Sequence, residues 1–458
     1  MGNHVRYVSS IHTTAYSIIA VQEMNLNYYY PPILWATARL MSESGSIDFL
    51  EEDLELLSSD EETEDAEQTS VNYFKMSSAI GKVRQFGVNI LPPNINESSF
   101  TFRPDVEKNT IYFGLKGISR VGNSIIYDII NNRPYSSLEN FLETIKVNKV
   151  QATMLIKSGA FDDFGDRVKM LYHYCDLIAD KKSRLTLQNA QRIIDLGLVP
   201  TDLKEYQDIF KLTKHLKKYF KFGDFLVPDE NMWNYVRMFD FNEIKIRDSE
   251  EYILVSDWEK WYKKKMEVLK AWIKKNEDEL LSQVNHAAVQ ELLDKYAVGN
   301  IAQWEMEALS YYHSYHELDT PEYKEWLDKL QVVSFDSLPE EPYIEWEGNN
   351  GAKKFELSRI VGTAIGRDKA KGIVGILTPS GFLKIRFHKS MFNRLDRQIK
   401  DDTGIEKSWF SKGTKLLISG YRLGDEFKVK IYKNHPFSQA VYKIEGVGLL
   451  TSKRKGES

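Results

Sequence analysis

The sequence predicts an α+β multidomain protein that is mainly helical in its N-terminal and middle regions and all-β near its C-terminal end. A chain of 458 residues is too long for one hydrophobic core, so we expect roughly two to four domains. Apolar residues recur at helical spacing through most of the chain. Beyond about residue 345 this pattern gives way to short alternating runs between Gly, Pro and Asp turns.

The N-terminal region predicts two helices within residues 11–44, broken at Pro31 and Pro32. A proline cannot continue the first helix, and it pushes the preceding residue toward extended backbone. The stretch 48–67 that follows is dense in Asp and Glu and contains no Lys or Arg. Its like charges favour a flexible, solvated linker, with a DNA mimic or a partner-binding tail as the alternative.

The middle of the chain, residues 172–345, is rich in Lys, Glu, Tyr and Trp. Within it Trp258, Trp261 and Trp272 recur near helical spacing. Aromatic residues in such a pattern belong to a hydrophobic core more often than to a base-stacking surface. We therefore expect core residues here, in a helical region whose role stays open.

Five short β-rich runs follow, and they are RIVGTAIG, GIVGILTP, FLKIRFH, KLLISGYRL and EFKVKIYK. Five such strands separated by tight turns suit a small barrel of the OB type. The stretch 353–433 holds nineteen Lys and Arg against eight Asp and Glu, although the whole chain has a net charge of −5. This end of the chain can therefore attract a polyanion.

Several classes of protein are disfavoured. No run approaches the ~18 apolar residues that cross a bilayer, and the first residues lack the apolar run of a signal peptide. Arg6 stands where a myristoylation motif needs Ser or Thr. A single cysteine, Cys175, rules out an internal disulfide and a multi-cysteine zinc site. We expect a cytoplasmic protein without membrane partners, in the host cytoplasm if a phage encodes it.

Residues 113–130, FGLKGISRVGNSIIYDII, read as two apolar helical stretches joined by a turn at Val121 and Gly122. One interpretation is simple packing, because glycine permits a close turn. The other is a helix-hairpin-helix. In that motif, free backbone N–H groups at the start of the second helix hold a phosphate of duplex DNA without reading its sequence. This stretch alone leaves both interpretations open.

Five blocks of the sequence occur in a fixed order. The first holds His12, Ala15, Tyr16, Gln22, Leu26, Tyr30 and Pro31; the others are FGVNILPPNINESSFTF, IYFGLKGISRVGNSIIYDIINNR with YSSLENFLETIKVNKVQATMLIKSGAFDDFGDR, EMEALSYYHSYHEL, and KGIVGILTPSGFLKIRFH. Together they resemble the family C replicative polymerases, the α subunits of bacterial DNA polymerase III. In that family these blocks belong to the end of the fingers, a tandem helix-hairpin-helix domain and an OB-fold.

Three departures from the family pattern matter. Arg120 stands where the hairpin usually has its first glycine, so a positive φ there would cost about 1 kcal/mol, while its guanidinium could reach a phosphate. Ile11 precedes His12 where the family often has a lysine, which puts a triphosphate contact in doubt. Tyr315 and Glu317 replace the usual Gly and Pro.

The palm carboxylates of the family have no counterpart in this sequence. Family C polymerases hold two Mg²⁺ ions on a D-x-D strand and a third carboxylate, and no D-x-D strand occurs here. The resemblance therefore implies no catalytic and no metal-ligating residue in this chain. It implies Mg²⁺ in a partner subunit that carries the palm, and no cofactor in this one.

The resemblance assigns three groups of residues. The hairpin residues that would hold duplex DNA are Lys116, Gly117, Arg120, Val121, Gly122, Asn123 and Lys149. The barrel residues that would guide single-stranded template are Lys371, Phe382, Lys384, Arg386, Phe387 and Lys389, with Phe382 or Phe387 stacking a base unless they are barrel core. The residues that would complete the fingers and face the partner are His12, Tyr16, Gln22 and Tyr30.

The expected division of the chain is as follows: end of the fingers at 1–47, acidic linker at 48–70, tandem helix-hairpin-helix domain at 71–171, Trp-rich helical region at 172–345, OB-fold at 346–440, tail at 441–458. We expect one subunit of a split replicative DNA polymerase, or else a shortened fragment of a longer one. The alternatives are a non-catalytic DNA-binding accessory protein and a structural or scaffolding protein. A sliding clamp is a further candidate partner, through 205–212, where Tyr206 stands in place of the Gln of a clamp-binding peptide.

Overall fold

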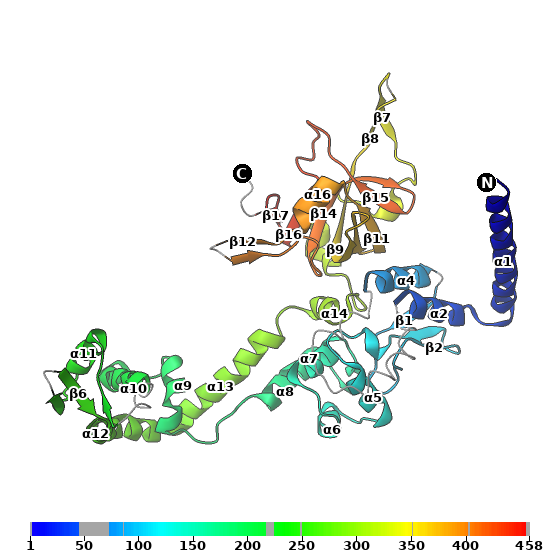
Figure 1. Ribbon diagram of the computed structural model, residues 1–458. Helices are drawn as coiled ribbons and strands as arrows, with labels where there is room; N and C mark the ends of the chain where they lie inside the picture. The colour runs from blue at the N-terminus through cyan, green and yellow to red at the C-terminus, as the bar shows by residue number, and fades with distance from the viewer. Residues whose placement is uncertain are drawn as a thin grey trace. The chain divides into compact units, whose positions relative to one another are not determined.

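The computed structural model describes residues 2–44, 73–85, 87–216, 224–247, 250–349, 351–401 and 404–454 (Figure 1). The acidic stretch expected to be a linker, 48–70, lies outside the described residues. Two compact units make up the chain. The first joins Met1–Leu171 to Gly299–Ser458, and the second is Tyr172–Val298.

The predicted break at Pro31 and Pro32 is confirmed. Helix α1 (Gly2–Tyr29) ends before the two prolines, and α2 (Pro32–Ser44) begins on the second of them, where a proline loses no intrahelical bond. Ile33 and Leu40 of α2 are buried, and α2 packs against α4 (Tyr73–Gln85). The two helices therefore differ, since α2 is part of the core and the described side chains of α1 are exposed.

A small mixed sheet precedes the hairpins. Its strands are β1 (Asn89–Leu91), β2 (Arg103–Asp105) and β3 (Thr110–Tyr112), in the order β1-β3-β2. The elements that follow are η2 (Leu115–Gly117), α5 (Asn123–Asn131), α6 (Leu138–Thr144), α7 (Lys149–Lys157), η3 (Asp162–Phe164) and α8 (Arg167–Ile178). The second hairpin joins α6 to α7.

The prediction of two full helices within 113–130 is wrong for the first of them, which is only the single 3₁₀ turn η2. The N–H groups of Leu115 and Lys116 bond to the carbonyls of Ser99 and Phe100, at 3.1 and 3.0 Å, instead of extending a helix. Glycine permits this close approach, because a Cβ at Gly114 would lie 2.5 Å from the main-chain carbon of Thr101.

The block 299–318 packs on the hairpin domain. Helix α14 (Ile301–Leu309) contacts α7 and is capped by Ser310 in left-handed backbone. Glu305, fully buried, pairs with Arg167 at 3.0 Å and accepts hydrogen bonds from the N–H groups of His313 and Ser314 at 2.8 and 3.0 Å. Glu305 therefore fixes the loop that follows α14 against the hairpin domain.

The C-terminal part is a five-stranded barrel, as predicted. Its strands are β9 (Ser358–Asp368), β10 (Ile373–Thr378), β11 (Gly381–Arg386), β14 (Lys415–Leu423) and β15 (Glu426–Val429), with α16 (Lys389–Asp396) between the third and the fourth. The order β15-β11-β10-β9-β14, closed by a β14–β15 pairing, and the parallel pairing of β11 with β15 give the OB topology. All five predicted runs fall on these strands.

Further elements surround the barrel. They are η7 (Glu317–Asp319), α15 (Pro321–Lys329), η8 (Phe335–Ser337), the hairpin of β7 (Ile344–Glu347) and β8 (Lys353–Phe355), the hairpin of β12 (Ile399–Asp401) and β13 (Gly404–Glu406), and the added strands β16 (Val441–Gly446) and β17 (Leu449–Thr451). Leu327 of α15 is buried against Leu318, Val361 and Leu417. The outer face of β9 and β14 is therefore covered at that point.

The second unit is mostly helical. Its elements are η4 (Leu187–Asn189), α9 (Ala190–Asp195), η5 (Thr201–Leu203), α10 (Lys204–Leu216), β4 (Phe225–Leu226), α11 (Glu230–Arg237), β5 (Ile244–Arg247), β6 (Glu250–Leu254), α12 (Val255–Lys275) and α13 (Glu277–Tyr296). Trp258 is fully buried, and Trp261 and Trp272 pack on the core partly buried, so the prediction of core aromatics is confirmed. Ile209 and Phe210 of the clamp-peptide candidate are also buried in α10, which leaves those two side chains no route to a clamp.

Candidate nucleic-acid interface

Arg120 holds the turn of the first hairpin in left-handed backbone. Its φ is 62°, which costs a non-glycine residue roughly 1–2 kcal/mol. The sequence argument expected strain here if φ were positive, and it is. The side chain is exposed, and we find no hydrogen bond or ion pair of the guanidinium among the described residues. The turn therefore presents a cation at a strained position.

The first turn of α5 has no side-chain cap. Gly122 is its N-cap, in extended backbone with φ −74° and ψ 162°, and as a glycine it has no side chain that could cap the helix. N–H groups in such a turn have no partner within the helix, and they carry the positive end of the helix dipole. Val121 beside it is buried and anchors the turn. This helix start therefore offers donors to an anion.

The second hairpin differs, because α7 caps itself. The side chain of Asn148 accepts hydrogen bonds from the N–H groups of Val150 and Gln151, both at 2.9 Å, and the Oε1 atom of Gln151 accepts one from the N–H of Asn148 at 3.0 Å. This capping box satisfies the donors that a phosphate would need. Lys149 is exposed on the same turn, so the second hairpin offers a point charge rather than a ring of amides.

Lys116 was predicted to contact duplex DNA, but its side chain is turned into the protein. It is 8% exposed, its ammonium donates to the Oδ1 atom of Asn123, and it lies 5.9 Å from the centre of the Phe100 ring. The side chain thus joins η2 to the start of α5. Gly117 has a similar packing role, because a Cβ there would lie 2.3 Å from the Phe113 ring. Both residues position the turn, and their geometry does not support direct contact with DNA.

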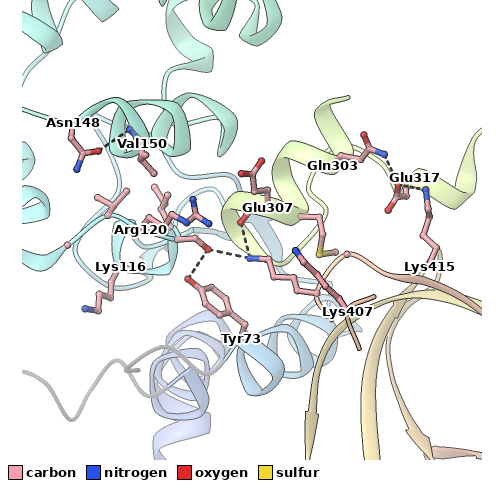
Figure 2. A pocket seen from close by; sticks show the side chains of 17 residues that line it. Tyr73, Lys116, Arg120, Asn148, Val150, Gln303, Glu307, Glu317, Lys407 and Lys415 are labelled. Carbon is pink, nitrogen blue, oxygen red and sulfur yellow. Dashed lines mark hydrogen bonds and ion pairs between the residues drawn. The ribbon is translucent and has the colours of Figure 1, made fainter. Parts of the chain in front are cut away.

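A cavity of about 950 Å³ opens beside the first hairpin (Figure 2). It is lined from the hairpins, from α14 and from the barrel loop before β14. The lining residues that carry charge are Lys116, Arg120, Lys407, Lys412, Lys415, Glu307 and Glu317. Five cations against two carboxylates make this cavity attractive to an anion.

Two of the five cations interact with side chains of the protein. Lys415 pairs with Glu317 at 3.2 Å, and Glu317 in turn accepts a bond from Tyr312 at 2.8 Å. Lys116 is held by Asn123. Arg120 and Lys407 are both exposed on the rim, without a side-chain partner among the described residues.

Lys412 is the fifth cation. Although the residue as a whole is exposed, its ammonium donates to the carbonyl of Glu307 at 2.8 Å and lies 5.1 Å from the centre of the Tyr73 ring. Desolvation lowers the pKa of Lys412 to about 8; Glu307 opposes this shift and Arg120 adds to it. The ammonium is therefore charged at neutral pH and titrates just above it.

The predicted barrel cations differ in whether the protein itself already neutralises them. Arg386 on β11 forms two bonds to Glu426, at 2.6 and 2.9 Å, and this contact raises the pKa of Arg386 and lowers that of Glu426. Lys384 is half-buried on the same strand, and Lys371 and Lys389 are exposed. Arg386 is thus already neutralised, while the three lysines stay candidates.

The two predicted stacking rings differ, and Phe387 is the one that a base cannot reach. Phe387 is buried in the barrel core, with its ring centre 4.8 Å from that of Phe410, so a base cannot reach it. Phe382 is half-buried, and its Cβ would lie 3.4 Å from a Cβ added at Gly81 of α4. Alternation along β11 permitted the core interpretation, and the structure favours it for Phe387.

The predicted partner-facing residues lie on α1 or just after it. Tyr16 and Tyr30 are 68% and 53% exposed, and Gln22 is exposed as well. His12 falls within α1, but its side chain lies outside the described ones. The exposed apolar residues of this segment include Ile18, Ile19, Val21, Met24, Leu26, Tyr28 and Tyr29. These side chains form a long apolar surface that is exposed among the described residues.

The described residues show neither a cluster of metal ligands nor a membrane-spanning helix. No group of three or more His, Cys, Asp or Glu residues there is placed to hold a metal ion. Within the same residues, every helix falls short of the length and apolar character that a membrane span needs.

Sequence reasoning missed Lys407 and Lys412, which the fold brings beside Arg120 from far along the chain. The basic excess of 353–433 was the available signal, but it does not say which lysines approach the hairpin. It also missed the cap at Asn148, although Asn followed three residues later by Gln is a sequence signature of a capping box.

Comparisons with known proteins agree with this arrangement. Residues 87–170 match the family model described as a helix-hairpin-helix motif. The chain is 35% identical, over 97% of its length, to a probable DNA polymerase YorL of Bacillus subtilis and to a DNA-directed DNA polymerase of Bacillus phage SPbeta. It is also 36% identical over 104 residues, 21% of the chain, to the DNA polymerase III subunit alpha of Thermus aquaticus, of which this match covers 8%.

The match spans only 35% of the length of the first two relatives. It includes the hairpins, the second unit and the barrel, since nearly the whole chain is aligned. The chain is therefore homologous to a segment of these phage-type polymerases and of the DNA polymerase III α subunits, and it contains their helix-hairpin-helix region.

Proposed function

We propose that this chain is the DNA-holding C-terminal part of a replicative DNA polymerase, working in the cytoplasm with a partner that carries the palm. The first hairpin holds the duplex leaving the active site, the barrel guides the single-stranded template, and α1 completes the fingers of the partner. The Mg²⁺ ions and the carboxylates that bind them belong to that partner.

One observation carries the DNA-holding role: the uncapped start of α5 faces the same cavity as Arg120, Lys407 and Lys412. Backbone N–H groups and cations together suit a phosphate, and none of them can read a base. Binding is therefore independent of sequence, and it weakens steeply as salt rises.

The partner role is supported by α1. Nine apolar or aromatic side chains between Tyr16 and Tyr30 are more than 40% exposed. A surface of this size marks an interaction site in most proteins. The same surface is what an interrupted fingers domain would leave open, so the proposed occupant is the remainder of the fingers.

A binding titration with charge-reversal variants tests the DNA-holding role. Arg120→Glu is expected to weaken binding to a primer-template duplex more than to a single strand, and Lys384→Glu is expected to do the opposite. Lys329→Glu, on the exposed surface of α15, is the matched control for net charge. Equal losses on both substrates would contradict this division of roles.

Primer extension tests the partner role. The purified chain alone is expected not to extend a primer. The palm-bearing partner is expected to co-purify with this chain, and adding it is expected to restore extension. Nucleotide incorporation by this chain alone would overturn the proposal. Failure to bind any DNA at low salt would favour a scaffolding role instead.

A further inference from the structure

The β7–β8 hairpin, which extends from the barrel in Figure 1, carries exposed apolar side chains. Tyr343, Ile344 and Trp346 are 66%, 46% and 57% exposed. A tryptophan that is open to solvent on a two-stranded hairpin contributes no core packing to this chain. Such a ring is typical of a contact surface, because it combines a large apolar face with a polar N–H.

More rings gather where this hairpin meets the barrel. The ring centres of Phe355, on β8, and Tyr421, on β14, are 4.7 Å apart. The hydroxyl of Tyr432 accepts a bond from the N–H of Phe355 at 2.8 Å, and the ammonium groups of Lys354 and Lys430 lie 5.3 and 5.7 Å from the Tyr432 ring centre. All three rings are only partly buried. They form a half-open aromatic surface that continues from the hairpin onto the barrel.

The sheet beside these rings is positively charged. Lys428 on β15 lies opposite Tyr421 on one side and opposite Arg386 on the other, and Glu426 lies opposite Lys384. Glu426 is engaged by Arg386. Lys384 and Lys428 also help to lower the pKa of Glu426 through their charge, but we find no hydrogen bond or ion pair of their ammonium groups among the described residues. Two ammonium groups are therefore left for an anion along this face.

The hairpin itself adds no opposing charge. Its two acids are each matched by a lysine of the facing strand, Glu345 with Lys354 at 2.8 Å and Glu347 with Lys353 at 3.7 Å. The charge of the whole surface is therefore set by the sheet. A polyanion with flat apolar groups fits it, and an acidic protein surface without such groups would leave Trp346 unused.

We propose that Trp346, Phe355, Tyr421 and Tyr432 form a stacking platform for the bases of a single nucleic-acid strand, with Lys384 and Lys428 holding its phosphates. A duplex is excluded as the ligand, because its bases stack on each other and offer no free face. The inference rests on the proposed function and assigns the single strand to rings that neither the motifs nor the comparisons point to. These rings take the stacking role that the sequence suggested for Phe387, which is buried in the barrel core.

Binding of the full-length chain to a fluorescein-labelled oligothymidine of about 20 nucleotides, and to a duplex of equal length, tests this platform. Trp346→Ala is expected to weaken single-strand binding about five- to tenfold, the effect of one lost base stack, and to leave duplex binding unchanged. Lys428→Glu is expected to weaken single-strand binding and to lower the slope of log affinity against log salt by about 0.7.

The controls are matched in chemistry. Tyr235→Ala removes an equally exposed ring from the second unit, and Lys329→Glu reverses an exposed charge on α15. Neither is expected to change binding to the single strand. Circular dichroism and thermal unfolding of each variant check that the fold is kept, which is expected for Trp346→Ala because the ring is exposed.

The results distinguish a failure of the stacking platform from a failure of the proposed function. If the unaltered chain binds the single strand and Trp346→Ala and Lys428→Glu behave like their controls, the platform is wrong and the proposed function stands. Equal losses on the duplex would also overturn the platform. If the unaltered chain binds neither DNA, the proposed function fails together with it.

Discussion

The ammonium of Lys412 donates a hydrogen bond to the main-chain carbonyl of Glu307, at 2.8 Å. The same ammonium lies 3.4 Å from the hydroxyl of Ser119, the residue before Arg120. One side chain of the barrel loop thereby reaches both the end of α14 and the turn of the first hairpin. Lys412 thus links the barrel loop to the hairpin, and a ligand of the cavity that it lines would contact both.

The first prediction concerns the charge of Lys412. Because the pKa of Lys412 is lowered to about 8 in the folded chain from its ordinary value of 10.5, the unfolded chain holds the proton over a pH range where the folded chain has lost it. The unfavourable contribution of this lysine is thus complete below pH 8 and is relieved as the pH rises toward 10.5. Stability should therefore rise more with pH over this window in the unaltered chain than in Lys412→Met, as urea unfolding can measure.

Loss of the charge should also weaken duplex binding. At constant salt, affinity is expected to fall between pH 7.5 and 9, about one unit around the pKa, more in the unaltered chain than in Lys412→Arg, whose guanidinium keeps its proton. Parallel pH profiles of the two proteins would show that Lys412 does not contact the DNA.

The second prediction separates stability from binding at Arg120. Arg120→Gly removes the strain of a φ of 62°, while the greater freedom of glycine in the unfolded chain offsets part of the gain. We expect a net stabilisation of roughly 0.5–1 kcal/mol together with a loss of duplex affinity of about tenfold or more, because one hydrogen bond to a charged group contributes about 1.5–3 kcal/mol. Urea unfolding and a duplex titration on the same sample measure both. A stabilised variant with unchanged affinity would remove Arg120 from the interface.

The third prediction concerns the buried pair of Glu305 and Arg167. Glu305→Ala leaves the guanidinium of Arg167, 6% exposed, with Asp162 as its remaining acid. Breaking a buried pair on one side typically costs about 3–5 kcal/mol, so the free energy of unfolding should fall by about 3 kcal/mol. Glu325→Ala breaks an exposed pair on α15 and is expected to cost less than about 0.5 kcal/mol. Similar values for the two variants would contradict this account.

The fourth prediction tests the close approach that replaces the first helix of the hairpin. A Cβ at Gly114 would lie 2.5 Å from a main-chain atom of Thr101, whereas a Cβ at Gly446 meets nothing nearer than 3.8 Å. Gly114→Ala is therefore expected to destabilise the chain by roughly 1–3 kcal/mol, and Gly446→Ala to have little effect. Thermal unfolding of both variants checks this, and an unperturbed Gly114→Ala would mean that the backbone there is not tightly packed.

The fold was largely predictable because its signals are local. Alternating apolar residues with tight turns are enough to place the five barrel strands, and two prolines are enough to separate α1 from α2. The first half of the hairpin was not predictable in this way. Its amides bond to Ser99 and Phe100, and nothing within 113–118 reveals partners outside that stretch.

The candidate site was predictable only in part. The position of Arg120 in the motif indicated its positive φ, and the turn at Gly122 indicated the uncapped helix. Lys412 could not be found, because its proximity to Ser119 depends on how the barrel loop folds back on α14. For Phe387 the alternation along β11 allowed either face, and the packing of α16 and Phe410 decides for the interior.

The contrast between the two hairpins has a consequence for how they respond to solvent. The N–H groups of Val150 and Gln151 donate hydrogen bonds to the side chain of Asn148. Their exchange with deuterium therefore requires that the start of α7 opens, and we expect added sulfate or phosphate not to change its rate. The start of α5 has a glycine N-cap without a side chain, so we expect an inorganic anion to slow exchange there and not at the start of α7. Of the two hairpins, only the first is thus expected to show anion-dependent amide exchange, although both have a turn that leads into a helix.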